Sequence, residues 1–367
     1  MATRHPSAKP REGLLELSTE SVMHEFGVLI GRFQPFHVAH LDLVRFALKQ
    51  AQTVVIGVGS SNQAPDTRNP WSADERQVMI RSCLTKEEND NIRFARLEDY
   101  YYSNMRWIAG VQKAISDHTG TSKDVKLIGF KKDASSFYLS LFPQWGPHLE
   151  PETHVDMNAT KVRDLMFTQD KIGIQNFLPP TVFDGITAWM ETEEYKRLHD
   201  EQHHIWAEQE KWRWRLQEIG VKHPPTFNTV DAVCICSGHI LVVRRGGKYG
   251  RGLIALPGGY IDINETLEKS CIRELKEETA IKLNRQELSN MIVDKDTFDH
   301  PLRDLRGRVI TQAFCFKLPD GKLPEVKGSD DADKAWWMPM NDVNNNRTRF
   351  FSDHWHIIDR FVGAHNF

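Results

Sequence analysis

The sequence lacks long apolar runs, cysteine motifs and a large excess of one charge. Its longest apolar stretches, such as Val54–Val58 and Ala232–Cys236, fall far short of the roughly 18 residues that a membrane-spanning helix needs. The formal net charge is −3, so no basic field favours nucleic acid or an anionic membrane. The five cysteines form no Cys-x-x-Cys motif, which fits a reducing compartment. We therefore expect a cytoplasmic protein with no nucleic-acid or membrane partner.

The length and punctuation of the chain indicate two domains. At about 150 residues per domain, 367 residues suffice for two domains and a connector. Proline pairs at 179–180 and 224–225 mark the ends of the middle segment. The sequence predicts a flexible leader (1–22), a first domain (23–185), a helical connector (186–223) and a second domain (224–367).

The first domain shows a strand–helix–strand pattern. Phe26–Ile30 and Thr53–Val58 are short buried-strand patterns, and His40–Gln50 between them has apolar residues at helical spacing. Such a unit of about thirty residues implies parallel strands, so we expect an open α/β sheet.

The connector is charged, aromatic and free of glycine and proline over residues 186–217. It predicts one or two helices whose tryptophans pack on a neighbouring domain. A basic, aromatic strip for nucleic acid is the weaker alternative, because acidic residues interrupt it.

A candidate phosphate site follows the first strand. The segment Gly31–His40 leaves that strand and enters a helix, where backbone N–H groups and the helix dipole favour anionic oxygens. Arg32 adds a positive charge, and His37 and His40 are spaced to face one phosphate chain. A His-x-x-His pair by itself is more often a packing or surface feature, but its position after a strand favours phosphate binding.

This segment, GRFQPFHVAH, resembles the GRFQPFHxGH motif of nicotinamide-nucleotide adenylyltransferases, with Ala39 in place of glycine. Met157–Arg163 (MNATKVR) is similar to the family's ISxTxxR segment, with Asn158 in place of serine, and Asn69–Arg76 (NPWSADER) is similar to its NPFTAGER segment. The resemblance implies a Rossmann-like nucleotidyltransferase domain, a parallel sheet with helices. It also implies catalytic roles for His37, His40 and Arg163, and substrate contacts from Gly31, Arg32, Phe33, Asn69, Arg76, Trp107 and Thr160.

The chemistry that the resemblance implies is adenylyl transfer from ATP. The phosphate of the mononucleotide attacks the α-phosphate and pyrophosphate leaves, so positioning and charge neutralisation suffice without a protein nucleophile. His37 and His40 would bind the ATP phosphates, Arg163 the β/γ end, and Mg²⁺ would share the charge. Trp107 would stack on the nicotinamide ring. Lys132, beside Lys131, is a further phosphate or substrate candidate, with a solvated loop as the equal alternative.

A second constellation lies near residue 270. Glu274, Glu277 and Glu278 fall at i, i+3 and i+4 of a predicted helix over Glu265–Thr279, so three carboxylates share one face. Such a cluster repels itself unless cations fill it, and hard divalent ions suit its oxygen ligands. Arg273 is spaced to pair with Glu265. A solvated acidic face is the usual alternative, but it does not predict the fixed spacing to Gly259, Glu265 and Arg273.

The spacing Gly259-x5-Glu265-x7-Arg273-Glu274 resembles the Nudix box, with Ala280 in place of its last glycine, where we expect a local backbone change. The resemblance implies a Nudix α/β/α sandwich with Glu274, Glu277 and Glu278 as ligands of Mg²⁺, or alternatively Mn²⁺. The segment 298–309 resembles a segment of Nudix enzymes that act on ADP-ribose. The general base stays open between Glu277 and an acid of the segment 330–333.

Together, the two resemblances indicate a bifunctional bacterial family. They imply synthesis of NAD from ATP and nicotinamide mononucleotide, and hydrolysis of ADP-ribose to AMP and ribose 5-phosphate. One alternative is a second domain that senses ADP-ribose or NAD without cleaving it, which the intact carboxylates disfavour. Another is an FMN or pantetheine-phosphate adenylyltransferase, which Trp107 disfavours. The sequence leaves open the amide or acid form of the mononucleotide and the oligomeric state, including a homo-oligomer.

Overall fold

The structure of the protein, a computed structural model, describes residues 23–131, 134–151, 157–218, 220, 225–330 and 332–365. The predicted leader and Lys132 lie outside the described residues. No helix in these ranges combines the length and apolarity that a membrane crossing requires.

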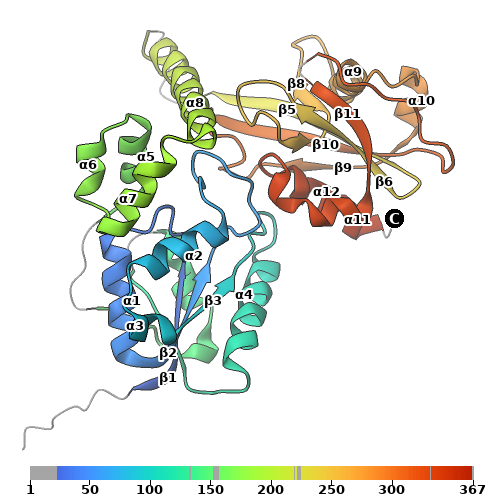
Figure 1. The fold of residues 1–367 in the computed structure, drawn as a ribbon. Coiled ribbons are helices and arrows are strands. Elements are labelled where there is room, and N and C mark those ends of the chain that lie inside the picture. Colours follow the sequence, from blue (N-terminus) through green and yellow to red (C-terminus); the bar gives the residue numbers. More distant parts are fainter. Residues whose placement is uncertain are drawn as a thin grey trace, which may run out of the picture.

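The first domain is built on a parallel four-stranded sheet in the order β3-β2-β1-β4 (Figure 1). This confirms the expected α/β class. The strands are β1 (His24–Gly31), β2 (Ala51–Val58), β3 (Ile92–Arg96) and β4 (Val125–Ile128). Val54, Val55 and Ile56 are completely buried, because helices cover both faces of a parallel sheet.

The covering elements follow the strands in chain order. They are α1 (Val38–Gln50), α2 (Ala73–Ser82), α3 (Lys86–Asp90), α4 (Asn104–Thr119) and the 3₁₀ helices η1 (Ala134–Ser140) and η2 (Pro143–Trp145). The amphipathic pattern expected for His40–Gln50 is confirmed in α1, whose Val44 and Ala47 are buried. In α4, Val111 and Ile115 pack on the opposite face of the sheet.

A helical segment joins the two domains. It comprises α5 (Ala159–Phe167), α6 (Lys171–Gln175), α7 (Pro180–Trp189) and α8 (Glu193–Glu218). Helix α7 crosses the boundary predicted at residue 185, because its buried Val182 and Ile186 belong to the core of the first domain. Helix α8 has 26 residues and is therefore about 39 Å long.

Helix α8 is part of two hydrophobic cores. Near its start, Tyr195 and Leu198 pack in the core of the first domain. About two to three turns later, Ile205 packs in a cluster formed by residues of the second domain. Between them, buried Glu201 accepts a hydrogen bond from the Gly250 N–H (3.4 Å). Helix α8 thus packs against both domains.

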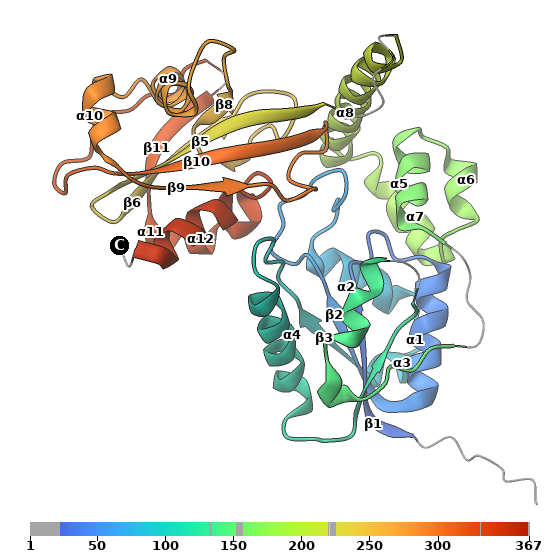
Figure 2. The same ribbon diagram turned by 180° about the vertical axis from the view of Figure 1, so that it is seen from behind.

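The second domain is a seven-stranded mixed sheet between helices (Figures 1 and 2). The strand order is β11-β6-β5-β10-β9, with β7 beside β6 and β8 beside β5. The strands are β5 (Thr226–Cys236), β6 (His239–Arg245), β7 (Ile254–Ala255), β8 (Gly258–Tyr260), β9 (Ile292–Phe298), β10 (Arg308–Lys317) and β11 (Ala332–Pro339).

Helices pack on both faces of this sheet, which confirms the α/β/α sandwich. They are α9 (Leu267–Thr279), α10 (Arg285–Asn290), α11 (Met340–Asn345), the 3₁₀ helix η3 (Arg347–Arg349) and α12 (His354–His365). Leu275 and Leu288 of α9 and α10 belong to one core cluster, and Val343 and Ile358 of α11 and α12 belong to the other.

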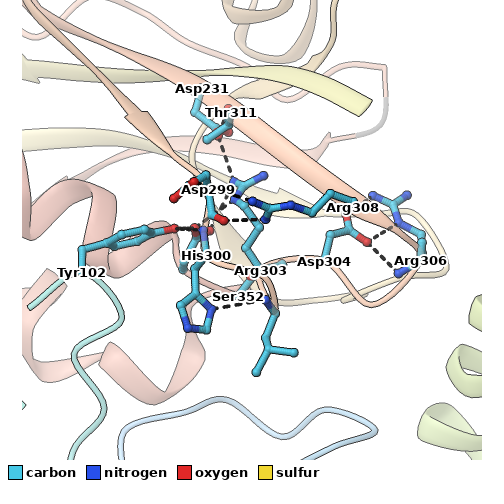
Figure 3. A network of polar contacts seen from close by, with 12 residues as sticks. Tyr102, Asp231, Asp299, His300, Arg303, Asp304, Arg306, Arg308, Thr311 and Ser352 are labelled. Carbon is cyan, nitrogen blue, oxygen red and sulfur yellow. Dashed lines mark hydrogen bonds and ion pairs between the residues drawn. The ribbon is translucent and has the colours of Figure 1, made fainter. Parts of the chain in front are cut away.

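A buried polar network joins the two domains (Figure 3). The Tyr102 hydroxyl, from the loop before α4, donates to Asp353 (2.6 Å). The completely buried Asp353 also pairs with Arg303 (2.9 Å), which reaches Asp231 (3.5 Å). The Thr311 hydroxyl donates to the same Asp231 carboxylate (2.7 Å). Burial alone would raise the pKa of Asp353, but Arg303 holds it below its usual value.

Contacts of the segment 98–106 surround this network. The Tyr101 ring stacks on His300 and His356, with ring centroids 4.1 and 4.8 Å apart. Arg106 pairs with Asp359 of α12. Glu98 pairs with Arg347 at 2.8 Å. One loop of the first domain therefore contacts the second domain along most of its length.

Asp353→Asn is expected to lower the free energy of unfolding by about 3–5 kcal/mol, because it leaves the buried Arg303 charge without its main partner. The matched control is Asp359→Asn in α12, the helix that begins just after Asp353; it breaks a partly exposed ion pair and is expected to cost about 0–1 kcal/mol. Urea unfolding of the two variants measures both values. Equal losses would contradict the structural importance given to the buried pair.

Candidate active sites

The first candidate site is a cavity of about 850 Å³ at the carboxyl ends of β1, β2 and β3. Six of the predicted residues line it: Gly31, Arg32, Phe33, His37, His40 and Trp107. They come from the β1–α1 turn and from α4, which the parallel sheet brings to one edge. The structure thus assembles the core of the predicted nucleotide site.

The two histidines stand together at the start of α1. His37 is the N-cap residue, and its backbone N–H donates to Nδ1 of His40 (3.3 Å). Their rings stack with centroids 3.5 Å apart and planes 16° apart. The positive end of the helix dipole lies at the same place, so an anion here is favoured by the imidazoles and by the backbone.

Charges around the turn are mixed but cation-rich. Burial lowers the pKa of Arg32, while Asp99 and Asp66 raise it in part. Burial raises the pKa of Asp99, while Arg32, Arg68 and Arg76 oppose that shift. Asp99 and Ser60 also line the cavity, although the sequence analysis did not select them. Asp99 follows β3 by three residues, and its place at the end of a strand could have identified it. The sequence pattern did not predict a strand over Ile92–Arg96.

Two predicted arginines are not among the residues that line this cavity. Arg76 is only 1% exposed, and its guanidinium donates to the carbonyls of Arg32 (2.6 Å) and Gly59 (2.7 Å). Arg163 donates to the carbonyl of Gln34 (2.6 Å) and to Thr160 Oγ1 (3.1 Å). In the structure, both arginines brace the backbone around the cavity.

Of the other residues predicted for the first site, Trp107 lines the cavity, whereas Thr160 and Asn69 are not among its lining residues. Thr160 lies in the first turn of α5 as the partner of Arg163. Asn69 closes a tight loop in which its backbone N–H donates to the Asp66 carboxylate (2.6 Å). Trp107 lines the cavity, and its ring centroid is 6.3 Å from that of Phe137 and 5.9 Å from that of Phe142. Trp107 is thus a predicted ring that a planar ligand in the cavity could meet.

In the second domain, the predicted loop–helix pairing is present. Arg273 donates to Glu265 (2.9 Å), Glu274 (2.7 Å) and Glu277 (2.9 Å). A Cβ at Gly259 would lie 2.7 Å from the Glu274 carboxylate, so only glycine leaves that carboxylate its present place. The spacing of this motif therefore has a direct steric meaning.

Glu278 is held against the strand opposite α9. Its Oε2 accepts a hydrogen bond from the Gly258 N–H (3.0 Å), and the residue is 8% exposed. Burial raises the pKa of Glu278 to about 8, against partial opposition from that hydrogen bond and from Arg245. Burial also raises the pKa of Glu274, while Arg273 opposes it. Buried carboxylates of this kind gain from a bound cation.

The carboxylates are not gathered in a finished metal site. Among the described residues, no three acidic, histidine or cysteine side chains converge as ligands. Arg273 occupies oxygens of Glu274 and Glu277, and Glu278 faces the strand. A divalent ion would therefore compete with Arg273 for the same oxygens.

A cavity of about 150 Å³ adjoins Glu278 and the glycines 258–259. Several ionisable residues that the sequence did not point to line it: Asp231, Arg245, Arg303, Asp304, Arg306 and His354. Arg306 makes a two-bond pair with Asp304 (3.0 and 2.7 Å; Figure 3). Three arginines beside Glu278, whose pKa is raised, suit a ligand that carries both phosphates and metal.

The expected backbone change at Ala280 is not found. Helix α9 ends at Thr279, and Ala280 adopts a φ of 49°, the left-handed conformation that glycine takes easily. Alanine therefore keeps the turn at the cost of some strain. Of the acids proposed as general base, Glu277 is 45% exposed and paired with Arg273, while Asp331 lies outside the described residues.

The buried Glu278 is expected to make the metal-free protein less stable as pH rises. Because its folded pKa of about 8 exceeds the ordinary 4.5, the folded state retains a proton that the unfolded chain loses, and stability falls between those pH values. Glu278→Gln should flatten this part of the profile. Melting temperatures in chelator at about pH 6 and pH 8 measure it, and an unchanged slope would contradict the role of burial.

Comparisons with known proteins agree with the two halves of the structure. A cytidylyltransferase-like family model matches residues 28–119, and a NUDIX domain model matches residues 225–361. A nicotinamide/nicotinic acid mononucleotide adenylyltransferase from Acinetobacter baylyi is 34% identical over 174 residues, which are 47% of this chain and 91% of that protein. An ADP-ribose pyrophosphatase from Methanocaldococcus jannaschii is 31% identical over 140 residues, 38% of this chain and 74% of that protein.

Solved structures of a bifunctional NMN adenylyltransferase/ADP ribose pyrophosphatase from Francisella tularensis match nearly the whole chain. One of them is complexed with AMP and a manganese ion. The TM-score is 0.84 at 31% identity, with 93% of this chain and 99% of that chain covered.

Proposed function

The chain belongs to the family of bifunctional NMN adenylyltransferases/ADP-ribose pyrophosphatases, and we propose that it performs each reaction at one of the two cavities described above. At the first cavity, ATP and nicotinamide mononucleotide react to give NAD and pyrophosphate. The second site hydrolyses ADP-ribose to AMP and ribose 5-phosphate. The observation that carries this proposal is the stacked pair His37–His40 at the helix start that faces the larger cavity.

In the first reaction, the protein orients the triphosphate of ATP and the phosphate of the mononucleotide, and it offsets their charge. His37, His40 and the N-terminus of α1 hold the phosphates of ATP, and Arg32 adds a fixed cation. Trp107 stacks on the nicotinamide ring. Arg76 and Arg163 are positioning residues, because their guanidinium groups fix the carbonyls of Arg32, Gly59 and Gln34. The roles of Asn69 and Thr160 would likewise be to shape the loop and to hold Arg163.

In the second reaction, Arg245, Arg303 and Arg306 bind the diphosphate and Glu274, Glu277 and Glu278 supply carboxylate oxygens. These oxygens fit Mg²⁺ or Mn²⁺, which when bound screens the phosphates and lowers the pKa of a water. Arg273 and Glu265 orient the loop before α9. Release of Glu277 from Arg273 would free it to bind the ion or to act as the general base.

A purely sensing second domain is the rival hypothesis. It would bind ADP-ribose with its arginines and would have no use for the buried Glu278, whose charged form burial disfavours in the absence of a cation. Glu278 nevertheless lies beside the arginines of the cavity, although burial disfavours its charged form. This arrangement supports hydrolysis.

The two activities are expected to fail independently. His40→Ala removes a phosphate contact and should lower NAD synthesis by about 10²–10³-fold, while ADP-ribose hydrolysis stays normal. Glu278→Gln should do the reverse, with hydrolysis down by orders of magnitude and only partly restored by excess Mg²⁺ or Mn²⁺. Assays of NAD and AMP formation on both folded variants measure this. Parallel loss of both activities in either variant would refute the two-site assignment.

Trp107→Ala is expected to raise KM for nicotinamide mononucleotide far more than KM for ATP. Stacking on a ring base is worth about 1–3 kcal/mol in comparable platforms. The matched control is Trp145→Ala, a buried ring of the same core that is not among the residues that line the cavity. Equal KM values for the mononucleotide in parent and Trp107→Ala would leave Trp107 with a packing role.

A further inference from the structure

The side chain of Tyr102 belongs to the first domain, but its hydroxyl lies among residues of the second domain (Figure 3). The oxygen donates a hydrogen bond to Asp353 (2.6 Å) and accepts one from the backbone N–H of His300 (3.3 Å). The ring meets Phe298 edge-on, with centroids 5.1 Å apart. Burial, and after it the Asp353 carboxylate, raises the pKa of Tyr102, so the hydroxyl keeps the proton that it donates.

The first domain fixes the backbone that carries Tyr102. On one side of it, Ser103 closes a turn by donating its N–H to the Tyr100 carbonyl (3.1 Å). Ser103 is also the N-cap of α4, where its hydroxyl accepts a backbone N–H of the first turn (3.3 Å). On the other side, the Asn62 side chain exchanges two hydrogen bonds with the backbone of Asp99 (2.8 and 3.1 Å). The hydroxyl therefore enters the second domain from a defined position.

Both contacts of the Tyr102 oxygen lead to Arg303. His300 begins the turn that carries this arginine, and its carbonyl accepts the Arg303 N–H (3.0 Å). Asp353 accepts from the guanidinium at Nε (2.9 Å) and at Nη2 (3.2 Å). These bonds do not use Nη1, and Arg303 lines the cavity beside Glu278. The tyrosine thus holds both the backbone and the counter-ion of an arginine at the hydrolase cavity.

A guanidinium that is already fixed binds a ligand better than one that must first be ordered. Arginine has many rotamers, and the loss of their freedom on binding reduces the affinity for the ligand. Removal of the Tyr102 hydroxyl takes one donor from the completely buried Asp353 carboxylate and the acceptor from the His300 N–H. The turn and the guanidinium would then be less firmly held, and a ligand would have to order them.

We propose that Tyr102 of the first domain is a positioning residue of the second active site, where it holds Arg303 in place for the diphosphate of the hydrolase substrate. The proposal rests on the proposed hydrolase function. Tyr102 acts through Asp353 and through the turn that begins at His300, and it does not touch the substrate itself. The affinity of the second site for its substrate thus depends on a side chain of the first domain.

The test compares Tyr102→Phe with the matched control Tyr100→Phe in the full-length protein with Mg²⁺. Both variants lose one hydroxyl from the same segment and keep the ring. The Tyr100 hydroxyl donates to Glu98 (2.9 Å), and its ring packs against a core cluster of the second domain. Tyr100 therefore shares the domain contact but has no printed bond to Asp353 or His300. Steady-state hydrolysis gives KM and kcat for ADP-ribose, and NAD synthesis checks that each variant is folded.

Tyr102→Phe should raise KM for ADP-ribose about tenfold with kcat much less affected, because the hydroxyl acts on binding and not on the reacting atoms. Tyr100→Phe should match the parent, and both variants should make NAD at the parent rate. A parent KM in Tyr102→Phe, or a loss confined to kcat, would overturn the proposal. An equal rise of KM in both variants would also overturn it, because general loosening of the domain contact would then explain the effect.

A double-mutant cycle tests whether Tyr102 acts through Arg303. Arg303→Lys keeps a cation against Asp353 but lacks the forked guanidinium, so it should raise KM for ADP-ribose by itself. Tyr102→Phe should then raise KM little further, because the group that it positions is already gone. If the two separate increases in KM multiply in the double variant, Tyr102 acts independently of Arg303 and the proposal fails.

Calorimetry separates this proposal from the proposed hydrolase function. ADP-ribose is titrated into metal-free protein that carries His40→Ala, so that the first site contributes little heat, with and without Tyr102→Phe. If the parent released no AMP with Mg²⁺ but binding of ADP-ribose depended on Tyr102, hydrolysis would be refuted and the positioning role upheld. Normal hydrolysis with KM and binding independent of Tyr102 would refute only the positioning role.

Discussion

The buried pair between Arg303 and Asp353 is the interaction on which the arrangement of the molecule depends. Asp353 is completely buried, and its carboxylate is satisfied by Arg303 from the second domain and by the Tyr102 hydroxyl from the first. The same arginine lines the hydrolase cavity. The arginine that we propose to bind the diphosphate is thus paired with a carboxylate that also joins the two domains. Removal of either partner would leave the other buried without its counter-charge.

The two sites meet the same chemical demand in opposite ways. In the proposed function, the first site binds phosphates with donors that are already in place: a helix N-terminus, two stacked imidazoles and Arg32. The second site has carboxylates whose charged form is disfavoured by burial, as the raised pKa of Glu278 indicates. We therefore infer that the second site needs a bound cation to complete it, whereas the fold alone forms the first.

The sequence predicts what is encoded locally and misses what distant segments assemble. The β1–α1 turn and the carboxylates of α9 lie within short windows, so their spacing was sufficient to find them. Asp99 was missed because its role follows from the pairing of β3 with β2. The guanidinium groups of Arg76 and Arg163 were expected at the substrate, but carbonyls remote in sequence bind them.

Helix α8 has a consequence for what happens when the two halves of this chain are separated. Tyr195 and Leu198 near its start are core residues of one domain and Ile205 is a core residue of the other, so the boundary between the two halves falls inside a packed helix. A cut on either side of this helix would expose apolar side chains of one domain to water. Each half of this chain is therefore expected to be less stable without the helix than with it.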